Sequence, residues 1–175
     1  ARRSQIILQF LFEALLLSFF AVIIGIIMLE SCIPVINQLL DMEKIEAGML
    51  EMHATDIHIA SVIHQSIESI RGFAEQNEII LEEPDVSEEI QIHADEQRTM
   101  QILINLISNA IKYSQPGKTV SVNVIESGQF AEIQVIDEGL GIPPQYTQKI
   151  FDRFQRIDRG AEKHASTGLG LAICK

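Results

Sequence analysis

The chain has 175 residues, of which 47% are hydrophobic and 21% are charged. This composition excludes a wholly disordered chain, and the length allows one ordinary domain with a core plus an additional segment. The formal net charge of −11 argues against a general nucleic-acid binder, which would present a basic face. The two cysteines, Cys32 and Cys174, lie far apart, so they fit a reducing compartment and predict neither a disulfide framework nor a zinc site.

An apolar run from Ile6 to Leu29 opens the chain, interrupted only by Gln9, Glu13 and Ser18. As a helix it would reach about 36 Å at about 1.5 Å per residue, enough to cross a hydrocarbon core of about 30 Å. We therefore expect a hydrophobic, transmembrane helix over residues 1–38, with 6–29 in the membrane. A buried or interfacial helix with Glu13 at its polar edge is the alternative. A cleavable signal peptide fits less well, because the run is long and no small-x-small site follows it.

The next segments alternate between helical and extended patterns. Residues 36–46 have the pattern of the last turns of an amphipathic helix that ends at Gly48. Asp56 predicts a cap for a helix running to about Gln76. Its apolar positions keep helical spacing: Ile59, Val62, Ile63, Ile67, Ile70 and Phe73. Residues 88–93 alternate as a short strand does.

A third helix and a hairpin follow. Asp95 predicts the cap of this helix, and Pro116-Gly117 predicts its end. Residues 119–125 and 130–136 alternate with period two around Gly128, which predicts an antiparallel hairpin. The order of elements predicts an α+β fold, a two-layer sandwich with helices on one face of a mixed sheet.

The stretch 105-NLISNAIKYS-114 places polar residues inside an apolar helix. At 100° per residue, Asn105, Asn109 and Lys112 share one stripe. The opposite side predicts the core face: Leu103, Leu106, Ile107, Ala110 and Ile111. Amide oxygens can bind a metal and lysine can contact phosphate. A solvated polar face explains the same stripe, so this stretch alone leaves both interpretations open.

Three further motifs follow in order. The segment 137-DEGLGI-142 puts a carboxylate at a strand end, beside glycines that allow close backbone approach. The segment 150-IFDRFQR-156 holds two phenylalanines three residues apart, a pattern that more often belongs to a core. The segment 167-TGLGLAI-173 leads from glycines into a helical start, which suits phosphate binding. Each motif is weak by itself.

Together, the four motifs resemble the N, G1, F and G2 boxes of the catalytic ATP-binding domain of sensor histidine kinases. These kinases share an ATPase class with gyrase, mismatch-repair and heat-shock chaperone proteins. The resemblance covers about residues 39–175. It includes 39-LLDMEKIEAGMLEM-52, which resembles the end of the second helix of the kinase dimerisation hairpin. It divides the chain into a hydrophobic helix (1–38), the end of the hairpin helix (39–50) and the ATP-binding domain (51–175).

The resemblance implies ATP and Mg²⁺ as ligands and assigns roles to the polar residues. Asn109, together with Asn105, would hold the Mg²⁺ that bridges the ATP phosphates. Lys112 would contact phosphate, and Tyr113 would pack beside the adenine. Asp137 would accept a hydrogen bond from the adenine amino group.

The other implied site residues shape the pocket and anchor a mobile lid over residues 155–167. They are Gly139, Gly141 and Ile142 in the adenine pocket, Phe151 and Phe154 at the base of the lid, and Thr167, Gly168, Leu169 and Gly170 at its far end.

The chain departs from the family pattern in its histidines. The family's acceptor histidine is followed by an acidic residue and then a basic-Thr/Asn-Pro pattern, and none of the five histidines fits. We therefore expect phosphotransfer from ATP to a histidine supplied by another chain's dimerisation hairpin, with a response regulator as the next partner. A homodimer is compatible with this expectation. The spacing of His53, His58 and His64 matches no metal-binding motif.

Two features concern the ends of the domain. The chain stops just after the fourth motif, where the family continues with a helix and strands, so the resemblance implies a domain incomplete at its C-terminus. Ser166 also stands where the fourth motif often has its first glycine.

The N-terminal segment 2–39 resembles a transmembrane stretch of permease subunits of macrolide-export or lipoprotein-release ABC transporters. Arg2 and Arg3 favour a cytoplasmic N-terminus. If the helix then crosses the membrane once, the ATP-binding domain that follows it would lie outside the cell. A membrane-associated kinase of the bacterial inner membrane needs that domain in the cytoplasm. Either the helix does not span the membrane, or its orientation is inverted, or the chain joins pieces of two genes near residues 36–40, and we hypothesise the last of these. A non-catalytic nucleotide-binding or dimerisation module, and a permease fragment fused to a kinase fragment, remain the alternatives to a sensor-kinase ATP-binding domain.

Overall fold

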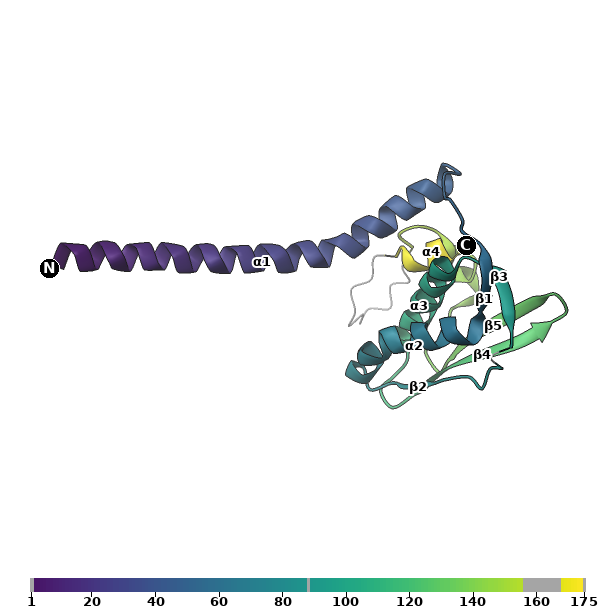
Figure 1. The fold of residues 1–175 in the computed structure, drawn as a ribbon. Coiled ribbons are helices and arrows are strands. Elements are labelled where there is room, and N and C mark those ends of the chain that lie inside the picture. Colours follow the sequence, from purple (N-terminus) through teal and green to yellow (C-terminus); the bar gives the residue numbers. More distant parts are fainter. Residues whose placement is uncertain (1, 88, 156–167, 175) are drawn as a thin grey trace. The chain divides into compact units, whose positions relative to one another are not determined.

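The computed structural model describes residues 2–87, 89–155 and 168–174 (Figure 1). The chain divides into two compact units, Ala1–Glu46 and Ala47–Lys175.

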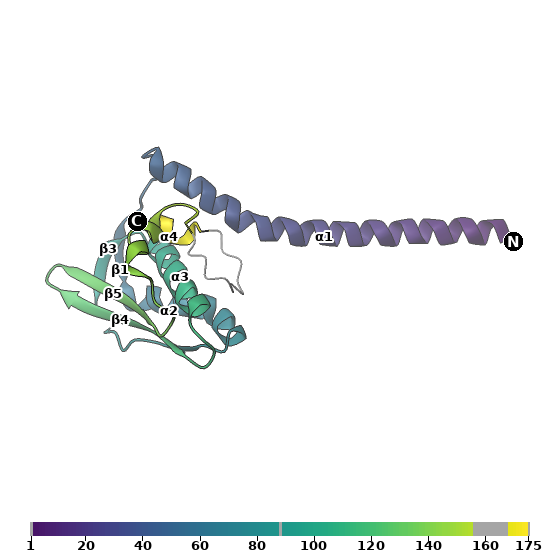
Figure 2. The same ribbon diagram turned by 180° about the vertical axis from the view of Figure 1, so that it is seen from behind.

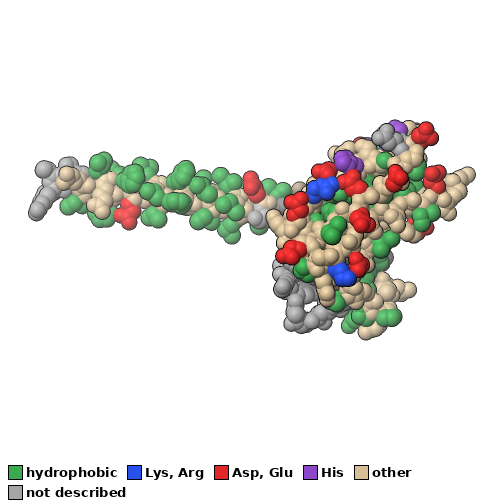
Figure 3. All heavy atoms as spheres, turned by 90° about the horizontal axis from the view of Figure 1, so that it is seen from below, with side chains coloured by type: hydrophobic (Ala, Val, Ile, Leu, Met, Phe, Trp, Pro, Cys, Tyr) green, Lys and Arg blue, Asp and Glu red, His purple; other side chains and the backbone are tan. Residues whose placement is uncertain are grey.

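The first unit is the helix α1 (Arg2–Glu46). Its described large hydrophobic side chains, such as Phe10 and Leu17, are exposed, and they occur along its whole visible length (Figure 3). Within Gln5–Ile45 an 18-residue window has a mean hydropathy of 2.6, so the length and composition of α1 suffice to cross a membrane. Gly48 follows the helix with a φ of +62°, the left-handed conformation in which helices often end. The predicted division of this region at residues 38 and 50 remains a prediction.

The second unit begins with strand β1 (Thr55–His58), helix α2 (Ile59–Gln76), strand β2 (Ile80–Glu82) and strand β3 (Gln91–Ala94). The prediction that Asp56 caps α2 is wrong. Asp56 lies within β1, where its carboxylate contacts His93 Nδ1 at 2.8 Å, and α2 follows His58 without a side-chain cap. Pairing of β1 with β3 explains the difference, because Ile57 is buried opposite Ile92 and such nonlocal pairing overrides a local capping preference.

The remaining elements are helix α3 (Glu96–Tyr113), strands β4 (Thr119–Ser127) and β5 (Phe130–Asp137), the 3₁₀ turns η1 (Pro144–Tyr146) and η2 (Lys149–Phe151), and the short helix α4 (Gly170–Ile173). The predicted cap is confirmed, because the Asp95 side chain accepts a hydrogen bond from Arg98 N. The predicted hairpin is confirmed as the antiparallel pair β4–β5. Strand β2, which the sequence analysis did not predict, runs parallel to β4.

The helices α2 and α3 pack beside each other and against the mixed sheet β2-β4-β5, while β1 and β3 form a separate two-stranded sheet (Figures 1 and 2). The core between these layers is aliphatic. Its fully buried members include Ile59, Ile63, Ile67, Leu103, Ile107, Ile111, Val120 and Val122. The predicted α+β arrangement of helices on a mixed sheet is therefore confirmed.

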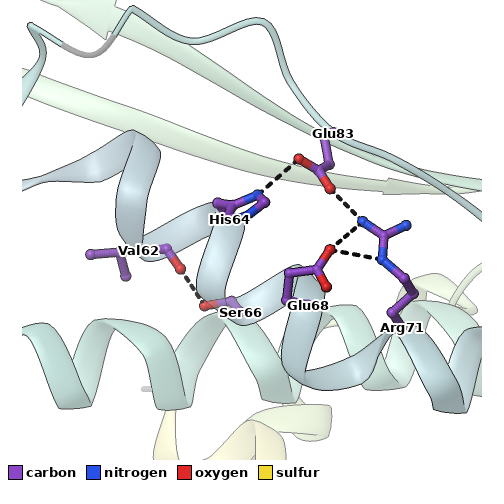
Figure 4. A network of polar contacts seen from close by, with 6 residues as sticks. All are labelled: Val62, His64, Ser66, Glu68, Arg71 and Glu83. Carbon is purple, nitrogen blue, oxygen red and sulfur yellow. Dashed lines mark hydrogen bonds and ion pairs between the residues drawn. The ribbon is translucent and has the colours of Figure 1, made fainter.

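The outer face of α2 carries a polar network that is closed within the protein (Figure 4). Arg71 donates to Glu68 Oε1 at 2.6 and 2.8 Å and to Glu83 Oε1 at 2.5 Å, and the other Glu83 oxygen lies 3.1 Å from His64 Nδ1. Glu68, followed by Glu83, raises the pKa of the Arg71 guanidinium. The side chains of His64, Glu68 and Glu83 are close enough together to surround a cation, but the guanidinium of Arg71 already supplies the positive charge between the two carboxylates.

Candidate functional site

A pocket of about 320 Å³ lies along α3 and the end of β5. Six residues of the predicted site line it: Asn109, Tyr113, Asp137, Gly141, Ile142 and Phe151. Six others line it without having been predicted as site residues: Leu106, Ala110, Val135, Ile150, Gln155 and Leu171. The pocket is thus apolar over much of its wall, with an amide and a carboxylate among its polar groups, as small-molecule sites are.

The wall contributed by α3 consists of Leu106, Asn109, Ala110 and Tyr113. These residues are spaced i, i+3, i+4 and i+7, so they share one face of the helix. The prediction that Leu106 belongs to the core face is wrong, because Leu106 is only partly buried and lines the pocket. The helical row Leu106, Asn109, Ala110 and Tyr113 was the sequence signal that could have placed Leu106 in the pocket wall.

Asn105 lies at a different place from Asn109, beside α4. A Cβ built on Gly170 would lie 3.3 Å from Asn105 Oδ1, so the Asn105 side chain lies close to the backbone of α4 at Gly170. Asn105 Nδ2 is buried and has no hydrogen-bond partner among the described residues. An unsatisfied buried amide of this kind is a group that a bound ligand or water can complete.

Cys174 is the neighbour of this amide. Its thiol donates to Gly170 O at 3.3 Å. Burial raises the pKa of the Cys174 thiol, and the nearby Asn105 side chain offsets part of that rise. Asn105 Nδ2 itself is not placed to form a hydrogen bond with any described residue. The thiol is therefore kept protonated and acts here as a half-buried packing group.

Lys112 is not brought to the pocket. Its Nζ lies 6.0 Å from the centre of the Phe73 ring on α2, a distance at which a cation is attracted to the ring. Burial lowers the pKa of Lys112. A contact between Lys112 and phosphate remains a prediction that would require this side chain to leave Phe73.

The turn after β5 is held by Asp137. Its Oδ1 accepts a hydrogen bond from Gly139 N at 2.8 Å. A Cβ on Gly139 would lie 2.6 Å from Tyr113 O and 2.7 Å from Asp137 Oδ1, so only glycine allows the turn to lie this close to the end of α3. Gly141 follows with a φ of +66°. The turn thereby keeps the Asp137 carboxylate at the pocket, where it is exposed.

Glu138 secures the same turn from the other side. It accepts hydrogen bonds from Lys118 Nζ at 2.9 Å and from Thr119 N at 3.3 Å. Lys118 is the main reason that the pKa of Glu138 is lowered. The ion pair joins the end of β5 to the start of β4 and so fixes the position from which Asp137 projects.

The two ends of the predicted lid meet in the structure. Phe154 N donates to Gly168 O at 3.0 Å, and a Cβ on Gly168 would lie 2.9 Å from Phe154 Cα. Both residues have positive φ, +57° for Phe154 and +69° for Gly168. Leu169, the residue after Gly168, is 1% exposed, whereas Phe154 is 62% exposed. Thr167 and residues 156–166 of the predicted lid lie outside the described residues.

Residues 94–175 match the family model described as histidine kinase-, DNA gyrase B-, and HSP90-like ATPase. The sensor histidine kinase WalK of Bacillus subtilis is 37% identical over 150 residues, which are 83% of this chain and 24% of WalK. The circadian input-output histidine kinase CikA of Synechococcus elongatus is 34% identical over 149 residues, which are 83% of this chain and 20% of CikA. This chain thus spans a quarter or less of these relatives.

Solved structures agree with these relatives in fold. The catalytic domain of histidine kinase ThkA has a TM-score of 0.61 and 27% identity, over 70% of this chain and 78% of that one. The histidine kinase AdeS of Acinetobacter baumannii shares the fold with a TM-score of 0.67 and 24% identity, over 83% of this chain and 65% of that one. Residues 94–175 therefore belong to an ATPase domain of the histidine kinase-type family, and its fold matches that of histidine kinase catalytic domains.

Proposed function

We propose that this domain binds Mg-ATP in the pocket along α3 and provides the phosphoryl donor for a histidine in another polypeptide segment. The observation that carries the proposal is the meeting of Asn109 and Asp137 in one largely apolar pocket. Their motifs are far apart in sequence, and the fold brings both to one cavity.

The adenine would lie between apolar walls and be recognised by Asp137. Leu106, Ile142 and Leu171 give the wall its apolar character. Asp137 Oδ1 is already engaged by Gly139 N, whereas Oδ2 makes no hydrogen bond among the described residues and can accept one from an exocyclic amine.

The phosphates and Mg²⁺ would lie towards Asn109 and Asn105. The fit is supported by the donor set, because amide oxygens are ligands that Mg²⁺ accepts, and by the unsatisfied buried amide of Asn105. Mg²⁺ would neutralise negative charge on the phosphates. Asn109 would hold and orient the metal-phosphate group, and Gly168 and Gly170 would allow backbone close to it.

The acceptor histidine would belong to a dimerisation hairpin outside the described residues, in the same polypeptide or in another chain. Among the described histidines, His64 contacts Glu83, His93 contacts Asp56, and His58 contacts Gln91. These contacts suit surface histidines of a folded domain. A response regulator would be the next partner, and the kinase ThkA has been solved in complex with the response regulator protein TrrA.

The first experiment is titration of Mg-ATP into the full chain in detergent micelles. We expect saturable binding that Asp137→Asn weakens at least about tenfold, the factor for losing one hydrogen bond to a charged group. Asn123→Ala, an exposed position on β4, is the matched control and should leave the affinity unchanged. Absence of binding to a folded chain would reject ATP binding.

The second experiment adds a separate acceptor hairpin and γ-labelled ATP. Acid-labile phosphohistidine on the hairpin would support catalysis. Nucleotide binding without any transfer would favour the alternative, a non-catalytic nucleotide-binding or dimerisation module.

We further propose that α1 anchors the protein in the bacterial inner membrane with the ATPase domain in the cytoplasm. The exposed apolar surface of α1 supports this proposal. The resemblance of residues 2–39 to an ABC-transporter permease instead suggests a fusion near residues 36–40. Reading the genomic DNA across this join in independent isolates tests it, and an uninterrupted frame in all of them would reject a fusion.

A further inference from the structure

Asp95 is a buried carboxylate that bonds to two separate segments of the domain. It is 7% exposed and lies directly before α3. One oxygen, Oδ1, accepts from Arg98 N at 3.1 Å, and the other, Oδ2, accepts from His53 N at 2.9 Å. Residues 53 and 95 are far apart in sequence, so the second bond is a tertiary contact in addition to the helix cap.

The bond to His53 fixes the segment that follows α1. Residues 47–54, which we call the linker, connect Glu46 at the end of α1 to Thr55 at the start of β1. Thr55 pairs with Ala94 in the β1–β3 ladder, so the bond from His53 N to Asp95 extends this pairing beyond the last ladder residue. These backbone hydrogen bonds, from His53 first and Arg98 second, lower the pKa of Asp95 and keep it ionised at neutral pH.

The bonds on the other side fix the first turn of α3. Besides the Oδ1 cap, the Asp95 carbonyl oxygen accepts from Thr99 N at 2.9 Å and from Thr99 Oγ1 at 2.8 Å. The same helix carries Asn105 and Asn109 further along. A helix is a rigid element, so the position of its first turn and the position of these amides are connected.

We propose that Asp95 is a positioning residue that couples the linker to the nucleotide-binding helix α3. The proposal rests on the proposed nucleotide site, because it states that occupancy of that site and order of the linker stabilise each other. Coupling of this kind is reciprocal. A nucleotide that holds α3 in place would slow opening of the linker, and a linker pulled away from Asp95 would weaken nucleotide binding by the same factor.

Asp95→Asn separates the two bonds of this residue. Asparagine retains one oxygen and is a good helix N-cap, so the bond from Arg98 N can persist. Its Nδ2 cannot accept from His53 N. Glu96→Gln is the matched control, because it removes the same charge at the neighbouring exposed position.

The test is amide hydrogen exchange of the full chain in detergent micelles, with and without saturating Mg²⁺ and a non-hydrolysable ATP analogue. Without nucleotide, Asp95→Asn should accelerate exchange of the linker amides at least about tenfold, as expected for losing a hydrogen bond to a charged group. The first turn of α3 should change less than about twofold, as for a retained cap. With nucleotide, linker exchange should slow in the natural chain and in Glu96→Gln. It should not slow in Asp95→Asn, even though the nucleotide still binds to that variant.

Three results would overturn the proposal. The linker amides of Asp95→Asn could exchange as slowly as those of the natural chain. Nucleotide could slow them equally in both proteins. Exchange could instead accelerate uniformly over α2 and α3, which would indicate general destabilisation. Asp95→Ser, which keeps a capping oxygen and also lacks the second acceptor, should repeat the Asp95→Asn result.

Failure of the proposed function is distinguishable from failure of this inference. If no nucleotide protects any pocket residue in the natural chain, ATP binding is rejected and so is the coupling. The nucleotide-free comparison would then still decide whether Asp95 holds the linker. A linker that is unchanged in Asp95→Asn while nucleotide protects the pocket rejects the coupling and leaves ATP binding intact.

Discussion

The helices α2 and α3 have the same length, 18 residues, and bury apolar faces in the same core, yet their polar faces differ. On α2 the outward groups satisfy one another, since Arg71 donates to both Glu68 and Glu83. On α3, Asn105 Nδ2 is buried without a hydrogen-bond partner among the described residues, and Lys112 contacts a ring rather than a carboxylate.

The difference indicates which polar face is built for a ligand. A solvated face tends to close its charges into local pairs, as α2 does. The α3 face instead lies along a pocket that Asp137 also lines. Buried polar groups without partners are rare in folded proteins, so the unpaired Asn105 amide, on the same helix that lines this pocket, favours the ligand-binding interpretation over the solvated one.

The core faces of α2 and α3 should contribute similarly to the free energy of unfolding. Ile67 on α2 and Ile107 on α3 are both 0% exposed, and truncating a buried isoleucine to alanine costs about 2–5 kcal/mol. We expect Ile67→Ala and Ile107→Ala each to lower the free energy of unfolding by an amount in this range, measured by chemical denaturation. A cost below about 1 kcal/mol at either position would show that the helices do not share the core equally.

Replacing a glycine by alanine should change the stability in opposite directions in the turn after β5 and on α2. Gly139→Ala places a Cβ against Tyr113 O and Asp137 Oδ1, and overpacking of this kind costs about 1–3 kcal/mol. Gly72→Ala on α2 meets nothing within 4 Å and should stabilise the helix by about 0.5–1 kcal/mol. Thermal unfolding of the two variants tests this pair, and a neutral Gly139→Ala would contradict the close approach of the turn to α3.

Substitutions on the polar faces of α3 and α2 should have different effects on nucleotide affinity. Asn109→Ala removes an amide from the pocket wall and should weaken Mg-ATP at least about tenfold, or about 1.4 kcal/mol. Arg71→Ala removes a guanidinium that contacts only the α2 network and should leave the affinity unchanged. Isothermal titration of both variants measures the difference, and equal losses would remove the functional distinction between the helices.

The smallest effect concerns the pH dependence of the α2 network. Hydrogen bonding by His64 is the first cause that lowers the pKa of Glu83 below its ordinary value of 4.5, and Arg71 adds to it. Since the folded pKa is depressed, this contribution to stability is present above pH 4.5 and disappears as pH falls through the folded pKa. Glu83 is exposed enough that we expect less than about 1 kcal/mol.

The difference in unfolding free energy between the natural chain and Glu83→Gln measures this contribution. The difference should be constant from about pH 5 to 6 and shrink towards pH 3. A difference that grows on acidification would contradict the assigned ion pairing.

The fold was predictable wherever the signals were local. Asp95 begins α3 as predicted, because capping depends on a backbone N–H only three residues away. The β4–β5 hairpin was also predictable, because alternation and a glycine turn lie within one short segment. The short strand β2 was missed, because it pairs in parallel with a strand far along the chain and has little pattern of its own.

The sequence by itself determined the four motifs, the helix carrying the amides and the family they resemble, since periodicity and residue type suffice for those. Only the tertiary structure decided that Leu106 lines the pocket, that Lys112 packs on Phe73 and that Asp56 belongs to a strand. Helical spacing fixes which residues share a face. Which part of that face meets a neighbour, and which part is left open as a cavity, depends on elements that are distant in sequence.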